Sequence, residues 1–369
     1  MPQPIRIIHL ASGDLWAGAE VQLYHLAKAL HQRDELRLLV VLLNHGRLET
    51  ALRKHGIEVQ VLDERHHHAL SIIRQLFRTV RHFRPDIIHS HRYKENILAA
   101  AIKLLRPRLQ LVRTVHGAQE ILWPWWRLDQ RLIHGLNTLT GRHLQGRIIA
   151  VSTELAGKLA MSYPASLLTT IVNGVDCEEI HQAAAAPAML PGEPQANKIA
   201  IACRLTAVKR VDIFLAVAQR LLQQPIRQYQ FYIFGDGPLL DELKGLAQHL
   251  GLSKDIWFMG FTDNIASYLA RMDAMLITSD HEGTPLILLE ALCLGIPVIA
   301  HATGGITALL ENRPPHQLCH SNQPDEFCRL IEQLSATSAA PETRDIQDIS
   351  ISRCADQTAR VYQQLLKVR

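Results

Sequence analysis

AAAAPAMLPG, residues 183–192, separates two stretches of sequence that each alternate short apolar runs with longer segments of helical periodicity. Seven apolar runs precede it: Ile5–Leu10, Leu36–Leu43, Val59–Leu62, Asp86–His89, Leu109–Thr114, Arg147–Val151 and Leu168–Val172. Five follow it: Ile199–Ala202, Phe231–Phe234, Ile256–Phe258, Ala274–Thr278 and Val298–Ala300. Short, nearly all-apolar strands between helices are typical of parallel sheets covered on both faces. The sequence therefore predicts an α/β fold of two Rossmann-like, doubly wound domains.

The length of the chain agrees with two domains, because its 369 residues exceed one typical domain. We place the first domain at residues 1–175 and the second at 176–350, and residues 351–369 form a C-terminal helix that could cross back to the first domain. Ligands of open parallel sheets bind beyond the carboxyl ends of the strands. Two such domains facing each other would share one interdomain cleft, where we expect the chemistry.

Composition and charge restrict the class of protein. The chain begins without the long apolar core of a signal peptide, and no stretch is long and apolar enough to span a bilayer, so we expect a cytoplasmic protein. Residues 1–175 hold 23 Lys and Arg against 13 Asp and Glu, whereas residues 176–369 hold 16 against 22. The first half is therefore basic and the second acidic.

The cysteines and histidines give no metal signal. The six cysteines are scattered without a Cys-X-X-Cys pair, so we expect reduced, buried thiols. The histidines, including His66-His67-His68, lack the ligand spacing of a structural zinc site. Neither domain carries the Gly-X-Gly-X-X-Gly loop after its first strand, which disfavours a nicotinamide dehydrogenase.

The most informative segment is HEGTPLILLEALCLGIP, residues 281–297. Thr284 suits a helix N-cap and Pro285 a first helical residue, while Gly295 ends the helix. This apolar helix carries Glu290, and Glu282 lies just before it. Two acids near the amide-rich end of a helix could hold the hydroxyls of a phosphorylated sugar. The alternative is structural: Glu282 caps the helix and Glu290 pairs with a core arginine.

Basic and glycine residues follow two strands of the second domain. Arg204 and Lys209 come after a strand and open a helix, where cations can meet a pyrophosphate, although a solvated pair is an equally good interpretation. Gly235 and Gly237 let the backbone approach a ligand closely, but Gly-Asp-Gly-Pro is also an ordinary turn.

These motifs together resemble the retaining, GT-B-fold glycosyltransferases of family 4, also called group 1. Glu282 and Glu290 match the two acids of the E-X7-E motif of this family, and similar motifs occur in family order at residues 173–176, 202–210, 234–238 and 300–305. The resemblance implies that Arg204 and Lys209 bind the diphosphate of a nucleotide-sugar and that Glu290 holds the ribose. It implies that Glu282 orients the sugar and that Gly235, Pro285, Leu286 and Ile287 line the donor site.

In the first domain the resemblance rests on two places. Residues 12–20, SGDLWAGAE, are similar to the glycine-rich loop that in this family meets the donor phosphate and the acceptor, with Gly18 as the close-approach residue. His116 follows a strand, like the histidine that this family places beside the transferred sugar; a lone histidine there is more often structural. We interpret His89 and His91 as strand-end and loop residues.

Two further features of the first domain could concern the acceptor. Residues 71–84 predict an amphipathic helix with Arg74, Arg78 and Arg81 on one face, which is either a solvated surface or a contact with an anionic membrane or phosphate-bearing acceptor. Trp123, Trp125 and Trp126 form either a core wedge or a loop that contacts sugar or lipid. No nucleic-acid recognition module is present.

The residues and the resemblance together predict a glycosyltransferase that moves a sugar from a UDP-sugar donor to a glycan or lipid-linked acceptor of the cell envelope, held by the first domain. The resemblance implies that the anomeric configuration is retained. We expect no cofactor and no metal, because the chain lacks the Asp-X-Asp metal clamp and offers cationic side chains instead. Peripheral association with the inner face of the cell membrane fits the basic helix. The alternatives are a nucleotide-sugar epimerase or hydrolase of the same fold and a noncatalytic carbohydrate-binding descendant.

Overall fold

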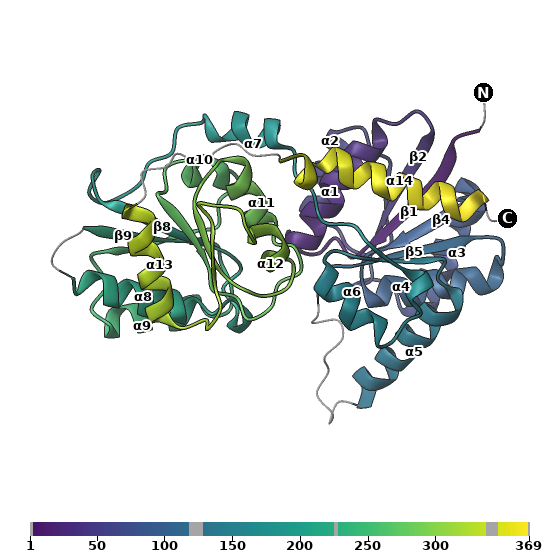
Figure 1. Cartoon of the computed structure of the whole chain (residues 1–369). Coiled ribbons are helices and arrows are strands. Elements are labelled where there is room, and N and C mark those ends of the chain that lie inside the picture. The colour runs from purple at the N-terminus through teal and green to yellow at the C-terminus, as the bar shows by residue number, and fades with distance from the viewer. Residues whose placement is uncertain (1–2, 118–127, 225–227, 337–345, 368–369) are drawn as a thin grey trace. The chain divides into compact units, whose positions relative to one another are not determined.

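The structure is a computed structural model that describes residues 3–117, 128–224, 228–336 and 346–367. The chain forms two compact units (Figure 1). Unit 1 consists of Met1–Val175 with Ile349–Arg369, and unit 2 consists of Asp176–Asp348.

Unit 1 contains a parallel sheet with the strand order β3-β2-β1-β4-β5-β6-β7. Its strands are β1 Ile5–Ala11, β2 Leu36–Leu42, β3 Val59–Val61, β4 Ile87–Ser90, β5 Gln110–Val115, β6 Arg147–Ala150 and β7 Leu168–Thr170. All seven strands predicted for this half are present. They form because each apolar run can be buried on both faces by the helices that alternate with it.

The helices of unit 1 are α1 Gly18–His31, α2 Arg47–Lys54, α3 Ala69–Phe83, α4 Tyr93–Leu105, α5 Leu128–Leu144, α6 Thr153–Ala160 and α14 Ile351–Lys367, with a 3-10 turn at Ala165–Leu167. The C-terminal helix α14 packs against α1. Its Tyr362 is fully buried in one core with Ile7 of β1 and Leu26 of α1. The end of the chain is therefore part of the core of unit 1.

Unit 2 contains a second parallel sheet with the order β10-β9-β8-β11-β12-β13. Its strands are β8 Asn197–Ala202, β9 Tyr229–Phe234, β10 Ile256–Gly260, β11 Ala274–Ile277, β12 Val298–His301 and β13 Gln317–Cys319. The five predicted strands are present, and β13 was not predicted. The helices are α7 Cys177–Ala184, α8 Val211–Leu222, α9 Leu240–His249, α10 Ile265–Leu269, α11 Leu286–Cys293, α12 Gly305–Leu310 and α13 Pro324–Ala336, with 3-10 turns at Ala207–Lys209 and Ile346–Ile349.

Each sheet has one point where the strand order reverses direction. In unit 1 it lies between β1 and β4, and in unit 2 between β8 and β11. The loops that leave neighbouring strands at such a point diverge to opposite faces, which opens a crevice at the carboxyl ends of the strands. A ligand site is therefore expected at the carboxyl edge of each sheet, beside these strands.

The expectation of six reduced cysteines was wrong for two of them. Cys177 and Cys293 form a disulfide with Cα atoms 5.4 Å apart, and Cys203, Cys319, Cys328 and Cys354 are free. Cys177 is the first residue of α7 and Cys293 the last of α11, and these helices pack together. Because 116 residues separate the pair, no local spacing pattern could have indicated it.

Candidate active site

Lys209 and Glu282 meet beyond the carboxyl ends of β8 and β11. Lys209 Nζ donates a hydrogen bond to Glu282 Oε1 at 2.5 Å, and the two side chains are 22% and 10% exposed. The sequence assigned these residues to one donor site, and the structure brings them together. They neutralise each other without a ligand, so an incoming diphosphate would compete with the carboxylate for the ammonium group.

The turn that carries Lys209 is fixed to the end of β11. The hydroxyl of Thr278 donates to the carbonyl oxygens of Lys209 and Arg210, each at 2.9 Å, and the backbone N–H of Asp280 donates to the Val208 carbonyl at 2.9 Å. Thr278 is fully buried. These bonds fix the backbone of Lys209 and so limit the positions that its ammonium group can reach. A binding site requires this kind of positioning.

Glu282 is held from the other side by Gly304. A Cβ atom on Gly304 would lie 1.7 Å from the Glu282 carbonyl oxygen, and the φ angle of Gly304 is +59°. Gly305 N–H donates to the Gly283 carbonyl at 2.7 Å. The loop before α12 therefore touches the backbone of the Glu282 loop, and only glycine allows this approach.

Gly235 and Gly237, like Gly304, allow two backbone segments to approach closely. A Cβ on Gly235 would lie 1.9 Å from the Cys203 carbonyl oxygen, and one on Gly237 would lie 2.4 Å from that of Leu205. The loop after β9 thus packs on the backbone beside Arg204. Arg204 is exposed, and no described residue forms an ion pair or a side-chain hydrogen bond with its guanidinium group. Arg204 is therefore a cation at the carboxyl edge of the unit 2 sheet that is available to a ligand.

The helix after Glu282 begins one residue later than predicted. Pro285 is the N-cap of α11, with φ −69° and ψ 127°, and its carbonyl oxygen accepts from the N–H of Leu288 and Leu289. Thr284 is therefore not the N-cap, since the extended ψ of Pro285 keeps Pro285 outside the helix. The C-terminal prediction is confirmed, because Gly295 has a φ of +67° just beyond the helix.

Helix α11 is apolar and buried except along one line. Its partly accessible residues are Ile287 and Glu290, which are one turn apart, while Leu286 is buried. Glu290 Oε2 is inaccessible and has no hydrogen-bond partner among the described residues. Burial raises the pKa of Glu290 to about 7. The alternative interpretation, in which Glu290 pairs with a core arginine, finds no such contact among the described residues. The buried carboxyl oxygen Oε2 therefore lacks the hydrogen bond that buried polar groups normally have.

The glycine-rich loop of unit 1 leads from β1 into α1. Gly18 is the first residue of α1, and the space that its Cβ would occupy is open. Two residues later, the 3% exposed Glu20 accepts a hydrogen bond from Arg92 at 2.5 Å, while its Oε2 has no partner among the described residues. Burial raises the pKa of Glu20, opposed by the nearby Arg92 cation. Nothing in the sequence indicated the Glu20–Arg92 pair, although Glu20 belongs to the glycine-rich loop of residues 12–20.

His116 lies just after β5, at the carboxyl edge of the unit 1 sheet. Its Nε2 is 3.3 Å from His91 Nδ1, and its own Nδ1 is inaccessible and unpartnered among the described residues. Burial lowers the pKa of His116 to about 3, aided by the charges of Arg92 and Arg113. The imidazole is therefore neutral at physiological pH, and its unpartnered Nδ1 carries either the ring proton or a lone pair.

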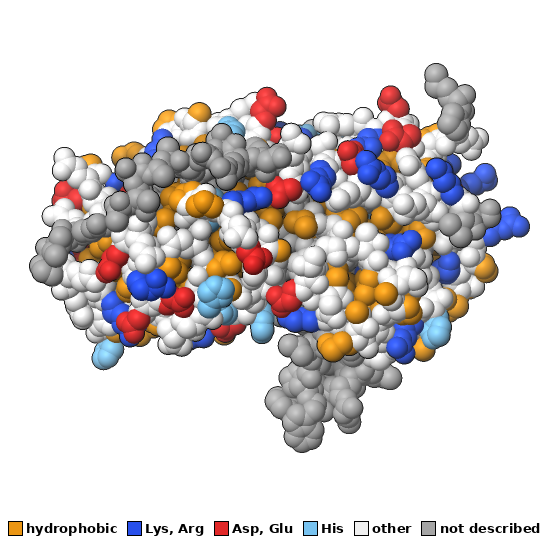
Figure 2. Space-filling model, viewed as in Figure 1, with side chains coloured by type: hydrophobic (Ala, Val, Ile, Leu, Met, Phe, Trp, Pro, Cys, Tyr) orange, Lys and Arg blue, Asp and Glu red, His pale blue; other side chains and the backbone are white. Residues whose placement is uncertain are grey.

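Two sequence predictions about the acceptor have different outcomes. The amphipathic helix is confirmed as α3, which buries Leu76 and Val80 and leaves Arg74, Arg78 and Arg81 exposed. Trp123, Trp125 and Trp126 lie outside the described residues. On the face shown in Figure 2, Lys and Arg side chains are more evident than Asp and Glu over unit 1.

Family models match both halves of the chain. Residues 190–347 match the model described as Glycosyl transferases group 1, and residues 16–179 match Glycosyltransferase Family 4. The chain belongs to the GT-B glycosyltransferases. The Lys209–Glu282 pair of this GT-B member lies in the segment matched by the first model, and His116 lies in the segment matched by the second.

Relatives and solved structures agree with this membership. The N-acetyl-alpha-D-glucosaminyl L-malate synthase of Bacillus anthracis is 27% identical over 63% of this chain and 61% of its own length. The UDP-Gal:alpha-D-GlcNAc-diphosphoundecaprenol alpha-1,3-galactosyltransferase of Escherichia coli is 25% identical over 70% of this chain and 69% of its own. This chain thus covers less than two thirds of the length of the Bacillus anthracis relative.

The fold is shared with HepE of Anabaena in complex with UDP and glucose. The TM-score is 0.80 at 22% identity, covering 98% of this chain and 100% of HepE. The apo lipopolysaccharide outer core galactosyltransferase WaaB has a TM-score of 0.70 at 15% identity, covering 98% and 99%. Both parallel-sheet units of the GT-B member thus have counterparts in one solved chain.

Proposed function

We propose that this protein transfers a hexose from a UDP-sugar to a cell-envelope glycan or lipid-linked acceptor, with retention of anomeric configuration. The observation that carries the proposal is the arrangement at the carboxyl edge of unit 2, where Lys209 and Glu282 are paired. Among the described residues, Arg204 has no ion-pair partner and Glu290 Oε2 has no hydrogen-bond partner. We assign the cations to a diphosphate and the acids to sugar and ribose hydroxyls, and the motif resemblance of these residues supports the assignment.

The charges at this edge suit the departure of a nucleoside diphosphate. As the bond between the anomeric carbon and the diphosphate oxygen breaks, negative charge grows on the phosphate oxygens. Arg204, Lys209 and the amides at the start of α11, at Leu286 and Ile287, can stabilise that charge. The new bond to the acceptor oxygen forms on the face that the leaving group vacates. The O–H bond of the acceptor breaks in the same step and the departing diphosphate takes up the proton, so retention needs no covalent intermediate. Side-chain cations supply the charge that a metal provides elsewhere.

A uridine donor is supported by the relatives. HepE is described in complexes with UDP, with UDP and glucose, and with UDP-glucose, and the printed name of the Escherichia coli relative specifies UDP-Gal. The same name describes a diphosphoundecaprenol acceptor, and WaaB is named for lipopolysaccharide. These names support a lipid-linked or lipopolysaccharide acceptor for the chain.

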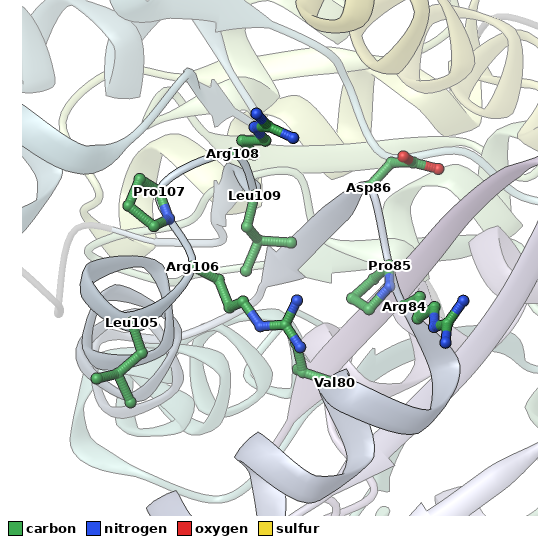
Figure 3. A pocket seen from close by; sticks show the side chains of 9 residues that line it. All are labelled: Val80, Arg84, Pro85, Asp86, Leu105, Arg106, Pro107, Arg108 and Leu109. Atoms are coloured by element: carbon green, nitrogen blue, oxygen red, sulfur yellow. The ribbon is translucent and has the colours of Figure 1, made fainter.

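A basic surface of unit 1 supports contact with anionic lipid. Arg74, Arg78 and Arg81 are exposed on α3. A pocket of about 460 Å³ continues this surface at the amino ends of β4 and β5, and its lining includes Arg84, Arg106 and Arg108. Figure 3 shows Arg106 extending from the loop after α4 toward Val80 at the end of α3. Because this pocket is at the opposite edge of the sheet from His116, we assign it to membrane contact and not to donor binding.

Exposed leucines lie near the same basic residues. Leu104 and Leu105 are 69% and 58% exposed at the end of α4, next in sequence to Arg106. Apolar side chains among cations are suited to the interface of an anionic bilayer. Within the described residues, no helix has the length and apolar content needed to cross a bilayer. The proposed contact is therefore peripheral.

The testing experiment combines donor binding with product analysis. The purified protein is incubated with UDP-glucose, UDP-galactose, UDP-GlcNAc and GDP-mannose, with and without a membrane extract that contains lipid-linked acceptors. We expect UDP release that depends on the extract and a glycosylated product that retains the α-configuration. Sugar release or epimerisation without acceptor would support the hydrolase or epimerase alternative, and saturable sugar binding without turnover would support the noncatalytic one.

A further inference from the structure

Six buried or partly buried side chains of unit 1 form one continuous chain of hydrogen bonds. It runs from β5 to β4, to α14, to β1 and back to the ends of β4 and β5, through Thr114, His89, Tyr362, His9, His91 and His116. The first four residues belong to strands or a helix that form the core of the unit. His116 is the end of the chain that lies at the candidate site.

The bonds of this chain use nearly every ring nitrogen. Thr114 Oγ1 is 2.7 Å from His89 Nε2, and Tyr362 Oη is 2.6 Å from His89 Nδ1 and 3.3 Å from His9 Nε2. His9 Nδ1 is 3.0 Å from His91 Nε2. His91 Nδ1 then meets His116 Nε2 at 3.3 Å, which leaves His116 Nδ1 as the unpartnered atom.

All four imidazoles are neutral. Burial lowers the pKa of His9 to about 3. Burial also lowers the pKa of His89 and of His91 well below the ordinary value, and neighbouring histidines add to these two shifts. A neutral imidazole carries one N–H and one lone pair. Each ring must therefore receive a hydrogen bond at one nitrogen and donate one at the other.

Proton counting leaves two arrangements that satisfy every link. If Tyr362 donates to His9, then His9 donates to His91, His91 donates to His116, and His116 Nδ1 carries the remaining proton. If Tyr362 donates to His89, each of these bonds reverses, and His116 Nδ1 is a lone pair. The state of one atom at the candidate site is thus tied to the hydroxyl of a residue on the C-terminal helix.

We infer that this histidine chain is a positioning device with Tyr362 as its central residue. Of the two arrangements it holds the one with a lone pair at His116 Nδ1, because the other would bury an N–H group that has no partner among the described residues. The sugar contact of His116 rests on the proposed function, whereas the tautomer itself does not. A group that meets a sugar hydroxyl with a fixed donor or acceptor is preorganised, because no rearrangement is needed when the sugar binds. The stacked rings support this, since the His89–His91 and His91–His116 centroids are 4.6 and 5.5 Å apart.

The same cluster contains ligand atoms of a type that metals use. Nitrogens of His9, His89 and His91 lie within 4.8 Å of one another. However, all six ring nitrogens of these residues already take part in the chain. A bound zinc ion would require those bonds to break, so stoichiometric zinc in the purified protein would overturn the inference.

The test is nitrogen NMR of the full chain labelled with ¹⁵N-histidine, because the chemical shift of a ring nitrogen distinguishes a protonated from an unprotonated atom. His116→Gln assigns the signals. We expect wild type to show one neutral His116 tautomer, and Tyr362→Phe to show both, since the link between His9 and His89 is lost. Tyr232→Phe is the matched control, because it removes a buried, hydrogen-bonded hydroxyl from unit 2. It should leave the wild-type spectrum of His116 unchanged.

A second variant keeps the inference testable if Tyr362→Phe does not fold. Thr114→Val removes the hydroxyl at the other end of the chain with little change of shape, and should also increase the second tautomer. An unchanged His116 spectrum in both variants, or two tautomers in wild type, would overturn the inference. In the transfer assay, Tyr362→Phe should lower kcat about tenfold at constant KM for the UDP-sugar. An altered spectrum with wild-type kcat would remove the link to the sugar, and absence of transfer by wild type would count against the proposed function alone.

Discussion

Lys209 Nζ and Glu282 Oε1 are 2.5 Å apart although 73 residues separate them in the chain. The first follows β8 and the second follows β11, the two strands at which the order of the unit 2 sheet reverses. A buried or partly buried pair of this kind is costly to break on one side only, because the remaining charge keeps its desolvation penalty. A ligand can separate the pair without this penalty if it supplies a new partner for the Lys209 ammonium group and another for the Glu282 carboxylate.

Glu282→Gln should therefore reduce sugar transfer about 100- to 1,000-fold, the usual effect of losing one charge-stabilising group in an active site. The protein should remain folded, because Gln has the same shape and can still accept a hydrogen bond from Lys209. Steady-state kinetics with the UDP-sugar and circular dichroism check both parts. Asp212→Asn is the control, since it breaks the exposed Arg210–Asp212 pair, whose contribution should be about 0–1 kcal/mol. Equal kinetics in the two variants would contradict the role of Glu282.

Gly304→Ala should disturb the same site through the backbone. The added methyl group would lie 1.7 Å from the Glu282 carbonyl oxygen and would need a φ of +59°, so the loop must move. We expect a loss of stability of about 1–3 kcal/mol and a loss of activity comparable to Glu282→Gln. The control is Gly245→Ala on α9, where no atom lies within 4 Å of the new Cβ. Chemical denaturation should show that this variant is as stable as wild type or more stable.

Glu290 should make stability depend on pH. Its pKa is raised from 4.5 to about 7 by burial, so the folded protein holds the proton more tightly than the unfolded chain. The resulting stabilisation is fully present below pH 4.5 and is lost as the pH rises through 7. Wild type should thus lose about 3 kcal/mol relative to Glu290→Gln between these limits.

Urea unfolding of both proteins at several pH values measures this difference. Glu242→Gln, on the exposed face of α9, controls for the loss of one carboxylate from the net charge. A difference between wild type and Glu290→Gln that stays constant with pH would show that Glu290 does not titrate in this range. Addition of a UDP-sugar should reduce the pH dependence, because a ribose hydroxyl would give the carboxylate its missing partner.

The sequence predicted twelve of the thirteen strands found in the described part of the chain, because nearly uninterrupted apolar runs are a local signal. It missed β13, Gln317–Cys319, which is three residues long and only partly buried. It also missed contacts that depend on register. His9 lies opposite His89 only because β1 and β4 pair in parallel, and Gly304 touches Glu282 only because two loops meet at one sheet edge. Single residues without periodicity carried no sign of these contacts.

Transfer activity should survive chelation. Arg204, Lys209 and the amides of α11 provide the positive charge that the departing diphosphate needs, and the sequence has no Asp-X-Asp clamp for a metal. Rates measured before and after dialysis against EDTA should be equal within error. Arg204→Gln, by contrast, should raise the KM for the donor and lower kcat, because the unpaired guanidinium is then absent. Loss of activity on dialysis that Mg²⁺ or Mn²⁺ restores would refute this prediction.

The basic face of α3 should bind anionic vesicles in a salt-sensitive manner. Each exposed arginine near such a surface contributes on the order of 1 kcal/mol, and salt screens the attraction beyond about 8 Å at physiological ionic strength. Changing Arg74, Arg78 and Arg81 together to Gln should therefore weaken cosedimentation with phosphatidylglycerol vesicles about 100-fold or less at low salt. The affinity for UDP should not change, because the proposed donor residues belong to unit 2.

A control with the same change of net charge separates local contact from overall attraction. Lys244, Lys254 and Arg329 are exposed on unit 2, and their joint change to Gln removes three charges far in sequence from α3. This second triple variant should bind vesicles nearly as well as wild type. If both variants lose binding equally, the attraction depends on total charge, and α3 is an ordinary solvated surface. If wild type does not bind at low salt, the proposed membrane contact is wrong, while the Glu282 and Glu290 predictions remain independent of it.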